Sequence, residues 1–261
     1  MNQQSTRPLP ESCCPALWLW PGQALYLGPS LDLGPHSGSV SCLAVGVDAP
    51  FTVDTSEHGE RTVHSALIAA RSTHRLIAHG QRMAFCYLDP ASGRELACRA
   101  RMTHGDDRVR HGHSAENALI DLAARLTGSA THVEAGHWLD LAGPETHATR
   151  DGRMAEAARR LLEPEGSTLS ADELSRSAGL STSRFLHLFR EHTGTSFRRY
   201  RLWARMLRAG VLLAERHDLT RAATEAGFAS PSHFSDSFRT MFGLSPTRLL
   251  AIETAIRVVR Q

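Results

Sequence analysis

The chain has 261 residues, of which 41% are hydrophobic and 21% charged, and this composition is typical of a soluble globular protein large enough for two domains. No apolar run approaches the roughly 18 residues of a membrane-spanning helix, which excludes a helical membrane protein. Five cysteines without regular spacing, and an N-terminus without a basic and apolar leader, predict a cytoplasmic protein rather than a secreted, disulfide-bonded one.

The net charge of +2 is unevenly distributed along the chain. Residues 150–261 hold 18 Arg against 12 Asp and Glu, a net charge of +6, whereas residues 1–149 hold 11 Arg against 15 acids, a net charge of −4. No lysine occurs, so every basic side chain is an arginine. A basic second half is the charge pattern expected of a protein that binds nucleic acid through that half.

The first part of the chain is predicted to be rich in β-structure. Residues 1–20 are Pro-rich and polar at first, and we expect a loose tail there. Short runs with Val, Ile, Leu or Phe then alternate with Gly, Pro, Asp and Ser, which is typical of a barrel or sandwich. The expected strands are Ala24–Leu27, Val40–Val47, Phe51–Val53, Thr62–Ala70, His74–Ala78 and Arg82–Leu88.

The periodicity changes after the strands. Apolar residues at helical spacing in Glu116–Thr127 and Thr131–Leu141 predict helices within residues 114–141. Such a face packs on its own domain or on a second copy of the chain, and both alternatives stay open. The polar segment 143–152, with its Gly and Pro, is the expected linker, so the first domain is predicted to span residues 1–142.

Residues 153–261 contain one motif twice. Ser181–Phe197 aligns with Ser230–Pro246 at an offset of 49, and seven of seventeen columns agree. The matching pairs are Ser181/Ser230, Ser183/Ser232, Phe185/Phe234, Phe189/Phe238, Arg190/Arg239, Gly194/Gly243 and Ser196/Ser245.

Each copy has the form of a helix-turn-helix. Ser181 can cap a helix, Phe185 and Phe189 share one face of it, and Gly194 can end it in a left-handed conformation. A short helix ending at Gly179 precedes this one, and Ser230 with Pro231 opens the equivalent helix of the second copy. Helices are also expected at Arg153–Leu162, at Ser196–Glu215 as the connection between the copies, and from Thr247. Trp203 should lie in the core.

The run from about Asp151 to Ala255 resembles the DNA-binding domain of the AraC/XylS family of transcription regulators. The resemblance rests on Leu174, Gly179, Ser181, Phe189, Arg190, Gly194 and Phe197, on Arg205 and Ala209, and on AGFASPSHFSDSFRTMFGLSPTRLL. It implies an α+β chain with a cupin-like N-terminal barrel and trailing helices, followed by an all-α double helix-turn-helix domain. It also implies double-stranded DNA as partner, a small-molecule effector in the N-terminal domain, a homodimer, and RNA polymerase contact if the protein is an activator. Neither a cofactor nor a membrane partner is implied.

The family motif, carried over position by position, assigns the DNA contacts. The base-facing residues are Ser183, Leu186, His187, Ser232, His233, Ser235 and Asp236. Arg184, Arg190 and Arg239 are assigned to phosphate, while Ser181 and Ser230 cap the helices and can contact phosphate too. Neither helix places Arg, Gln or Asn at a base-facing position, although those side chains make the best bidentate base contacts. The alternative for each residue is a solvated helix face.

A second class of function would be an enzyme whose β-domain is catalytic. Eleven of the fifteen histidines lie in residues 1–149, but His-x-His spacing is missing at His36, and only His64 and His74 could converge from different strands. No second cysteine pair at zinc spacing follows Cys13-Cys14. No nucleophile constellation or phosphate loop stands out. We therefore expect neither a catalytic site nor a metal site, and favour the regulator.

Overall fold

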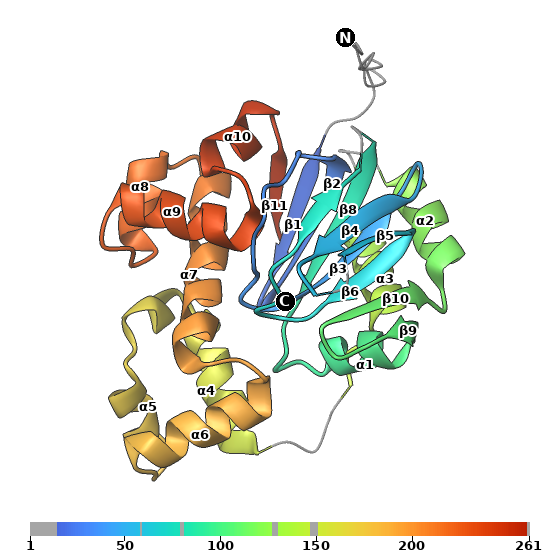
Figure 1. Cartoon of the computed structure of the whole chain (residues 1–261). Coiled ribbons are helices and arrows are strands. Elements are labelled where there is room, and N and C mark those ends of the chain that lie inside the picture. Colours follow the sequence, from blue (N-terminus) through green and yellow to red (C-terminus); the bar gives the residue numbers. More distant parts are fainter. Residues whose placement is uncertain (1–14, 58, 79–80, 127–129, 147–150, 260–261) are drawn as a thin grey trace.

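The structure is a computed structural model that describes residues 15–57, 59–78, 81–126, 130–146 and 151–259. Strands dominate the first part of the chain and helices the second (Figure 1). The predicted α+β class is therefore confirmed.

Two sheets make up the β-rich part. Within the described residues, one sheet has the strand order β11-β1-β2-β8-β3-β6-β10-β9 and the other the order β5-β4-β7. The bounds are β1 (Ala16–Trp20), β2 (Gln23–Pro29), β3 (Ser41–Gly46), β4 (Phe51–Thr55), β5 (Gly59–Val63), β6 (Ser65–Ile68), β7 (Arg75–Ile77), β8 (Arg82–Leu88), β9 (Met102–Gly105), β10 (Val109–His113) and β11 (Ala255–Val258). The six runs predicted as strands overlap β2 to β8, and Thr62–Ala70 is divided between β5 and β6.

The loose tail predicted for residues 1–20 is wrong for its last part. Ala16–Trp20 forms β1, which pairs with β2 on one side and with β11 on the other. Trp18 is fully buried there, so this apolar run stabilises the sheet instead of lying in solvent. Residues 1–14 of the predicted tail, with Cys13-Cys14, lie outside the described residues.

The C-terminal strand was also not predicted. β11 runs parallel to β1, with Ala255 opposite Ala16 and Val258 opposite Leu19. A segment that we assigned to the DNA-binding domain thus completes the N-terminal sheet (Figure 1). The boundaries at residues 142 and 153 stay a prediction, because the two parts of the chain share a hydrophobic core.

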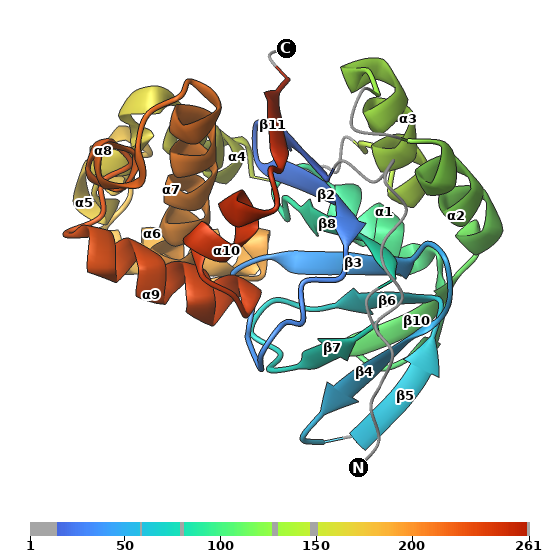
Figure 2. The same ribbon diagram turned by 90° about the horizontal axis from the view of Figure 1, so that it is seen from above.

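The two faces of the large sheet pack against different helices, as the alternation along β2 illustrates. Leu25 and Leu27 belong to the cluster that contains Trp138, whereas Ala24 and Tyr26 belong to the cluster that contains Trp203. The first cluster is covered by α1 (Arg94–Ala100), α2 (Glu116–Arg125) and α3 (His132–Ala142), of which α2 and α3 were predicted (Figure 2). The second joins the sheet to the C-terminal helices.

The C-terminal part is helical, as predicted. Its elements are α4 (Gly152–Leu162), a 3₁₀ turn (Pro164–Thr168), α5 (Ala171–Ser177), α6 (Thr182–Thr193), α7 (Phe197–Ala214), α8 (Leu219–Glu225), α9 (Pro231–Phe242) and α10 (Pro246–Ala251). Figure 1 shows α6 near one end of α7 and α9 near the other. Across the described ranges, no helix has both the length and the apolarity needed to cross a membrane.

Candidate nucleic-acid interface

The first helix-turn-helix consists of α5 and α6. Gly179 lies between them with a φ of 66°, a left-handed conformation that glycine adopts without strain. The Ser181 hydroxyl accepts a hydrogen bond from the Arg184 amide at 3.3 Å, which satisfies one of the free N–H groups at the start of α6. At the other end, Gly194 caps the helix with a φ of 66°. The predicted start and end of this helix are confirmed.

Aromatic packing fixes the orientation of α6. Phe185 and Phe189 are fully buried, and their ring centroids lie 5.7 Å apart. Phe189 also packs edge-to-face on Phe197 at 5.5 Å and on Tyr200 at 5.4 Å, so it joins α6 to α7. Because one face of α6 is held in this cluster, the opposite face is directed outward.

That outward face carries the residues assigned to DNA. The side chains of Ser183, Leu186 and His187 are exposed, and Leu186 keeps 39% of its surface in solvent although it is apolar. Arg184 and Arg190 are exposed as well. The structure therefore brings the predicted base-facing and phosphate-facing residues of the first copy together on one surface. Their contacts with DNA stay a prediction.

The second helix-turn-helix, α8 and α9, repeats the construction. Gly227 has a φ of 84° in the turn, the Ser230 hydroxyl accepts from the His233 amide at 3.0 Å, and Gly243 ends α9 with a φ of 77°. Phe234 is buried and packs on Phe228, with ring centroids 5.1 Å apart. Ser232, His233, Asp236 and Arg239 are exposed, while Ser235 is half-buried.

Two of the predicted base-facing residues have partners within the chain. The His233 ring lies edge-on to Phe228 at 5.6 Å, and its Nδ1 accepts from the Ala229 amide at 3.4 Å. Asp236 is paired with Arg239 at 3.5 Å, and both side chains are largely exposed. Since an exposed pair of this kind contributes little to stability, Asp236 can leave Arg239 at low cost.

The connecting helix α7 holds both motifs against the sheet. Trp203 lies in the core, as predicted, and its indole Nε1 donates to the Gly22 carbonyl at 2.9 Å. The Tyr200 hydroxyl donates to Asp89 Oδ1 at 3.0 Å in a buried contact. Arg205, one of the residues on which the family resemblance rests, donates to the Ser167 carbonyl at 2.9 Å and so ties α7 to the 3₁₀ turn after α4. The bonds to Gly22 and Asp89 fix α7 to the N-terminal part.

A segment of the N-terminal part also contacts the second recognition helix directly. The Gly34 amide donates to the Gly243 carbonyl and the Ser37 amide to the Thr240 carbonyl, both at 3.0 Å. These bonds satisfy carbonyls at the end of α9 that the helix itself leaves free. Sequence patterns gave no sign of this contact, because its partners are about 200 residues apart in the chain.

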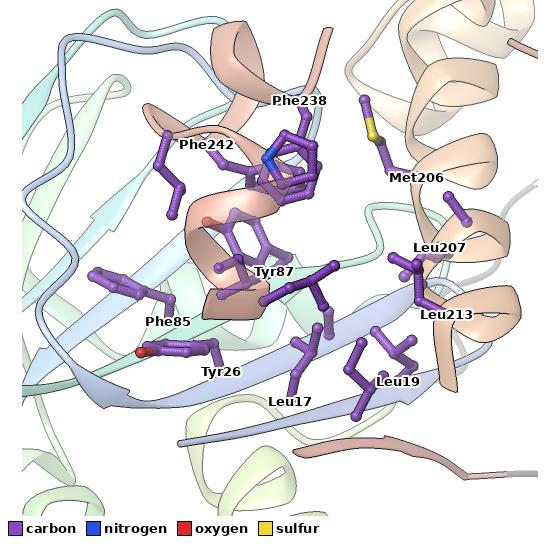
Figure 3. Close-up of a pocket in the computed structure, with 18 of the residues that line it drawn as sticks. Leu17, Leu19, Tyr26, Phe85, Tyr87, Met206, Leu207, Leu213, Phe238 and Phe242 are labelled. Atoms are coloured by element: carbon purple, nitrogen blue, oxygen red, sulfur yellow. The ribbon is translucent and has the colours of Figure 1, made fainter. Parts of the chain in front are cut away.

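An apolar cavity of about 90 Å³ lies where the sheet meets α7, α9 and α10 (Figure 3). Tyr26, Phe85 and Tyr87 line it from the sheet, Met206 from α7 and Phe242 from α9. The sequence placed the effector site inside the N-terminal domain. This cavity draws its lining from both parts of the chain, and the predicted effector site in the N-terminal domain stays a prediction.

The histidines do not gather into a metal site in the part of the chain that the structure describes. No group of three or more His, Cys, Asp or Glu side chains with metal-binding geometry occurs there. His74 lies against His36 rather than converging with a ligand set: their rings are 4.2 Å apart, and the two residues form a β-bridge.

Comparison with known proteins connects these helices to a family. A family model described as a helix-turn-helix domain matches residues 174–251. The probable transcriptional regulator LumQ of Photobacterium leiognathi is 42% identical over 81 residues, which are 31% of this chain and 33% of LumQ. The HTH-type transcriptional regulator GlxA of Rhizobium meliloti is 30% identical over 146 residues, 53% of this chain and 44% of GlxA. This chain thus spans less than half the length of either relative.

Solved structures resemble the chain over most of its length. ToxT from Vibrio cholerae superposes with a TM-score of 0.53 and 11% identity, covering 88% of this chain and 97% of ToxT. The apo form of a single-substitution variant of ToxT gives a TM-score of 0.59 and 12% identity over 89% of this chain and 98% of that one. At such identities the likeness shows the fold alone. The C-terminal helices match in sequence as well, and residues 174–251 form a helix-turn-helix domain of the AraC type.

Proposed function

We propose that this chain is a sequence-specific, DNA-binding transcription regulator and not an enzyme. The observation that carries the proposal is the pair of capped helices α6 and α9: α6 buries Phe185 and Phe189, α9 buries Phe234, and both expose most of the residues that the motif assigns to bases. Double-stranded DNA is the partner, with α6 and α9 in two successive segments of the major groove. The relatives that match the C-terminal part are transcription regulators by name, which supports this role.

The apolar cavity between the sheet and the C-terminal helices is our candidate for the effector site. ToxT has been solved with an unsaturated fatty acid and with a naphthalenyl butenoic acid, both of which combine an apolar body with a carboxylate. A ligand of that class is larger than a space of about 90 Å³, so it would have to displace side chains such as Met206. Because α9 lines the cavity, such a displacement would move a recognition helix relative to the sheet.

Further partners follow from the same proposal. We also propose a homodimer that forms through the outer side of the α2–α3 pair, where Val133 of α3 is exposed. If the protein is an activator, RNA polymerase is a partner as well.

Selection of bound sequences from a pool of random DNA duplexes tests the function. The full-length chain is expected to enrich one sequence family. Its affinity for the enriched site should fall steeply with salt, because phosphate contacts release counterions. Equal binding to every duplex would argue against a sequence-specific regulator, and no binding at low salt would reject DNA as the partner.

Asp236 gives a sharper prediction about the second helix. A carboxylate that faces phosphates is repelled, so it weakens binding to random DNA, and it regains that cost by accepting a hydrogen bond from a cytosine N4 amino group. Asp236→Ala should therefore tighten binding to random DNA and lose about 1–3 kcal/mol of discrimination at one base pair. Affinities for a panel of single-base variants of the selected site measure this loss.

The matched control is Glu191→Ala, which removes an exposed carboxylate from the end of α6 opposite its capped start. It should leave discrimination unchanged. If Asp236→Ala tightens binding equally on all variants of the site, Asp236 reads no base, and its role is limited to the pair with Arg239.

A further inference from the structure

A groove of about 710 Å³ lies between the first half of α7, the face of α9 and the segment around Ser37 and Ser39. Arg198, Arg199, Arg201 and Arg205 line it from α7, and Asp236 and Thr240 line it from α9. The groove therefore adjoins the surface of α9 that faces DNA in the proposed function. Through Arg198 and Arg199 it begins next to the turn that follows α6.

The four arginines of the groove have no carboxylate partner among the described residues. Arg199 donates to the Gly38 carbonyl at 3.4 Å, Arg201 to the Leu169 carbonyl at 3.2 Å, and Arg205 to the Ser167 carbonyl. Asp236 is the acid that lines the groove, and it is paired with Arg239 instead. The groove thus has an excess of positive charge that the protein itself does not neutralise.

Several arginines on the other C-terminal helices are arranged differently. Arg159 pairs with Glu156, Arg176 with Asp172, and Arg221 with Glu225. Acids lie close to these arginines on the helix surface, at spacings of three or four residues. On α7, by contrast, FRRYRLWARMLRAGVLLA contains arginines at five positions and no acid. The sequence of α7 therefore offers its arginines no acid at these spacings, in contrast to α4, α5 and α8.

Burial and mutual repulsion make the positive charge of the groove arginines energetically unfavourable as long as no anion is close to them. The pKa of Arg199 is lowered by burial and by the neighbouring charges of Arg71 and Arg198, and the pKa of Arg205 is lowered by burial and by Arg201. The buried Nε of Arg205 also lacks a hydrogen-bond acceptor within the part of the chain described here. A bound anion would relieve the repulsion and supply acceptors, and the guanidinium fork matches phosphate oxygens well.

We propose that this arginine groove binds the phosphate backbone of the DNA segment that passes between the two major-groove contacts. The proposal rests on the proposed function, because it requires α6 and α9 to lie on the same DNA. It favours DNA over a free anion because the groove lies between α7 and α9, begins beside the turn that follows α6, and shares Asp236 with the surface of α9 assigned to DNA. Arg198, the exposed member, and Arg201 are the direct contacts. They carry affinity but no sequence preference.

The test compares R198Q and the double variant R198Q/R201Q with the unaltered full-length chain on the DNA selected by that chain. Log affinity falls linearly with log salt, and each phosphate contact that is lost should make this fall shallower by about 0.9. Between about 50 and 200 mM salt, the drop in affinity should therefore shrink by about 3.5-fold for R198Q and about 12-fold for the double variant. Discrimination between single-base variants of the site should stay the same.

R159Q serves as the control, because it removes a charge from α4 that is paired with Glu156 and lies outside the groove. It should keep the slope of the unaltered chain. Thermal melting of each variant identifies a loss of fold, and R198Q alone decides the question if the double variant melts early, because Arg201 also packs on the Phe197 ring at 5.6 Å.

Two results would overturn the proposal while leaving the proposed function intact. In one, the unaltered chain binds its site, and R198Q and the double variant keep its salt slope. In the other, calorimetry detects inorganic triphosphate binding that R198Q abolishes while the salt slope on DNA is kept, which would make the groove a site for small anions. Failure of the unaltered chain to bind any DNA would instead reject the proposed function.

Discussion

Replacing Phe189 with alanine is expected to lower the free energy of unfolding by about 3–5 kcal/mol and to abolish specific DNA binding. The Phe189 side chain is fully buried and contacts the rings of Phe185, Phe197 and Tyr200, so its removal leaves a cavity between α6 and α7. Without this contact α6 is no longer held at a fixed orientation to α9, and the two helices cannot enter the same face of DNA together. Urea unfolding followed by circular dichroism measures the first effect, and binding to the selected site measures the second.

Leu186→Ala is the matched control on the same helix. Leu186 is 39% exposed, so its truncation should change the free energy of unfolding by less than about 0.5 kcal/mol. It should still alter binding, because Leu186 is assigned to a base. A Phe189→Ala variant as stable as Leu186→Ala would show that the aromatic cluster does not hold α6.

Acidification is expected to destabilise the chain through His74, by about 3 kcal/mol between pH 6.5 and 4. Burial and the neighbouring His36 lower the pKa of His74 to about 4. Because the folded pKa lies below the unfolded one, the unfolded chain takes up a proton that the folded chain excludes. The contribution of neutral His74 is therefore complete above pH 6.5, declines as the pH falls, and is lost by about pH 4.

Urea unfolding at intervals between pH 7.5 and 4.5 measures the slope of the free energy of unfolding against pH. The substitution His74→Gln should make this slope shallower. Part of the slope should remain in that variant, because burial also lowers the pKa of His36. His187→Gln, a substitution at an exposed histidine of α6, should keep the slope of the unaltered chain. If His74→Gln keeps it as well, the pH dependence arises from other groups. The His36–His74 pair lies beside the bonds from Gly34 and Ser37 to the end of α9, so acid should also weaken that contact.

The parts of the fold that depend on local signals could be predicted from sequence. The bounds of α6 and α9 could be predicted to within a few residues from capping serines, from glycines in left-handed turns and from phenylalanines four residues apart. Each of these signals acts inside one helix. The same spacing placed Ser183 and His187 on the exposed face. The short apolar runs located β2 to β8 for a similar reason.

The parts that depend on distant residues could not be predicted. β1 and β11 pair although they are some 240 residues apart in the chain, and the sequence of neither strand indicates which strand it pairs with. The polar ribbon of β9 and β10 was missed because β9 buries one residue of four, which leaves little alternation to detect. The arginine groove was missed because the run Arg198-Arg199 followed by Arg201 looks like an ordinary solvated surface until α9 and Gly38 are placed beside it.

Hydroxyl-radical footprinting of the full-length chain on its selected site tests the central claim most directly. Two helices held at either end of α7 should protect two patches on one face of the DNA, with centres roughly 10–10.5 base pairs apart for each bound chain. The equivalent substitutions Arg190→Gln and Arg239→Gln should each weaken protection at a different patch. One patch of about 5 base pairs, weakened by only one of these substitutions, would contradict the account, because one helix-turn-helix would then serve only as a scaffold.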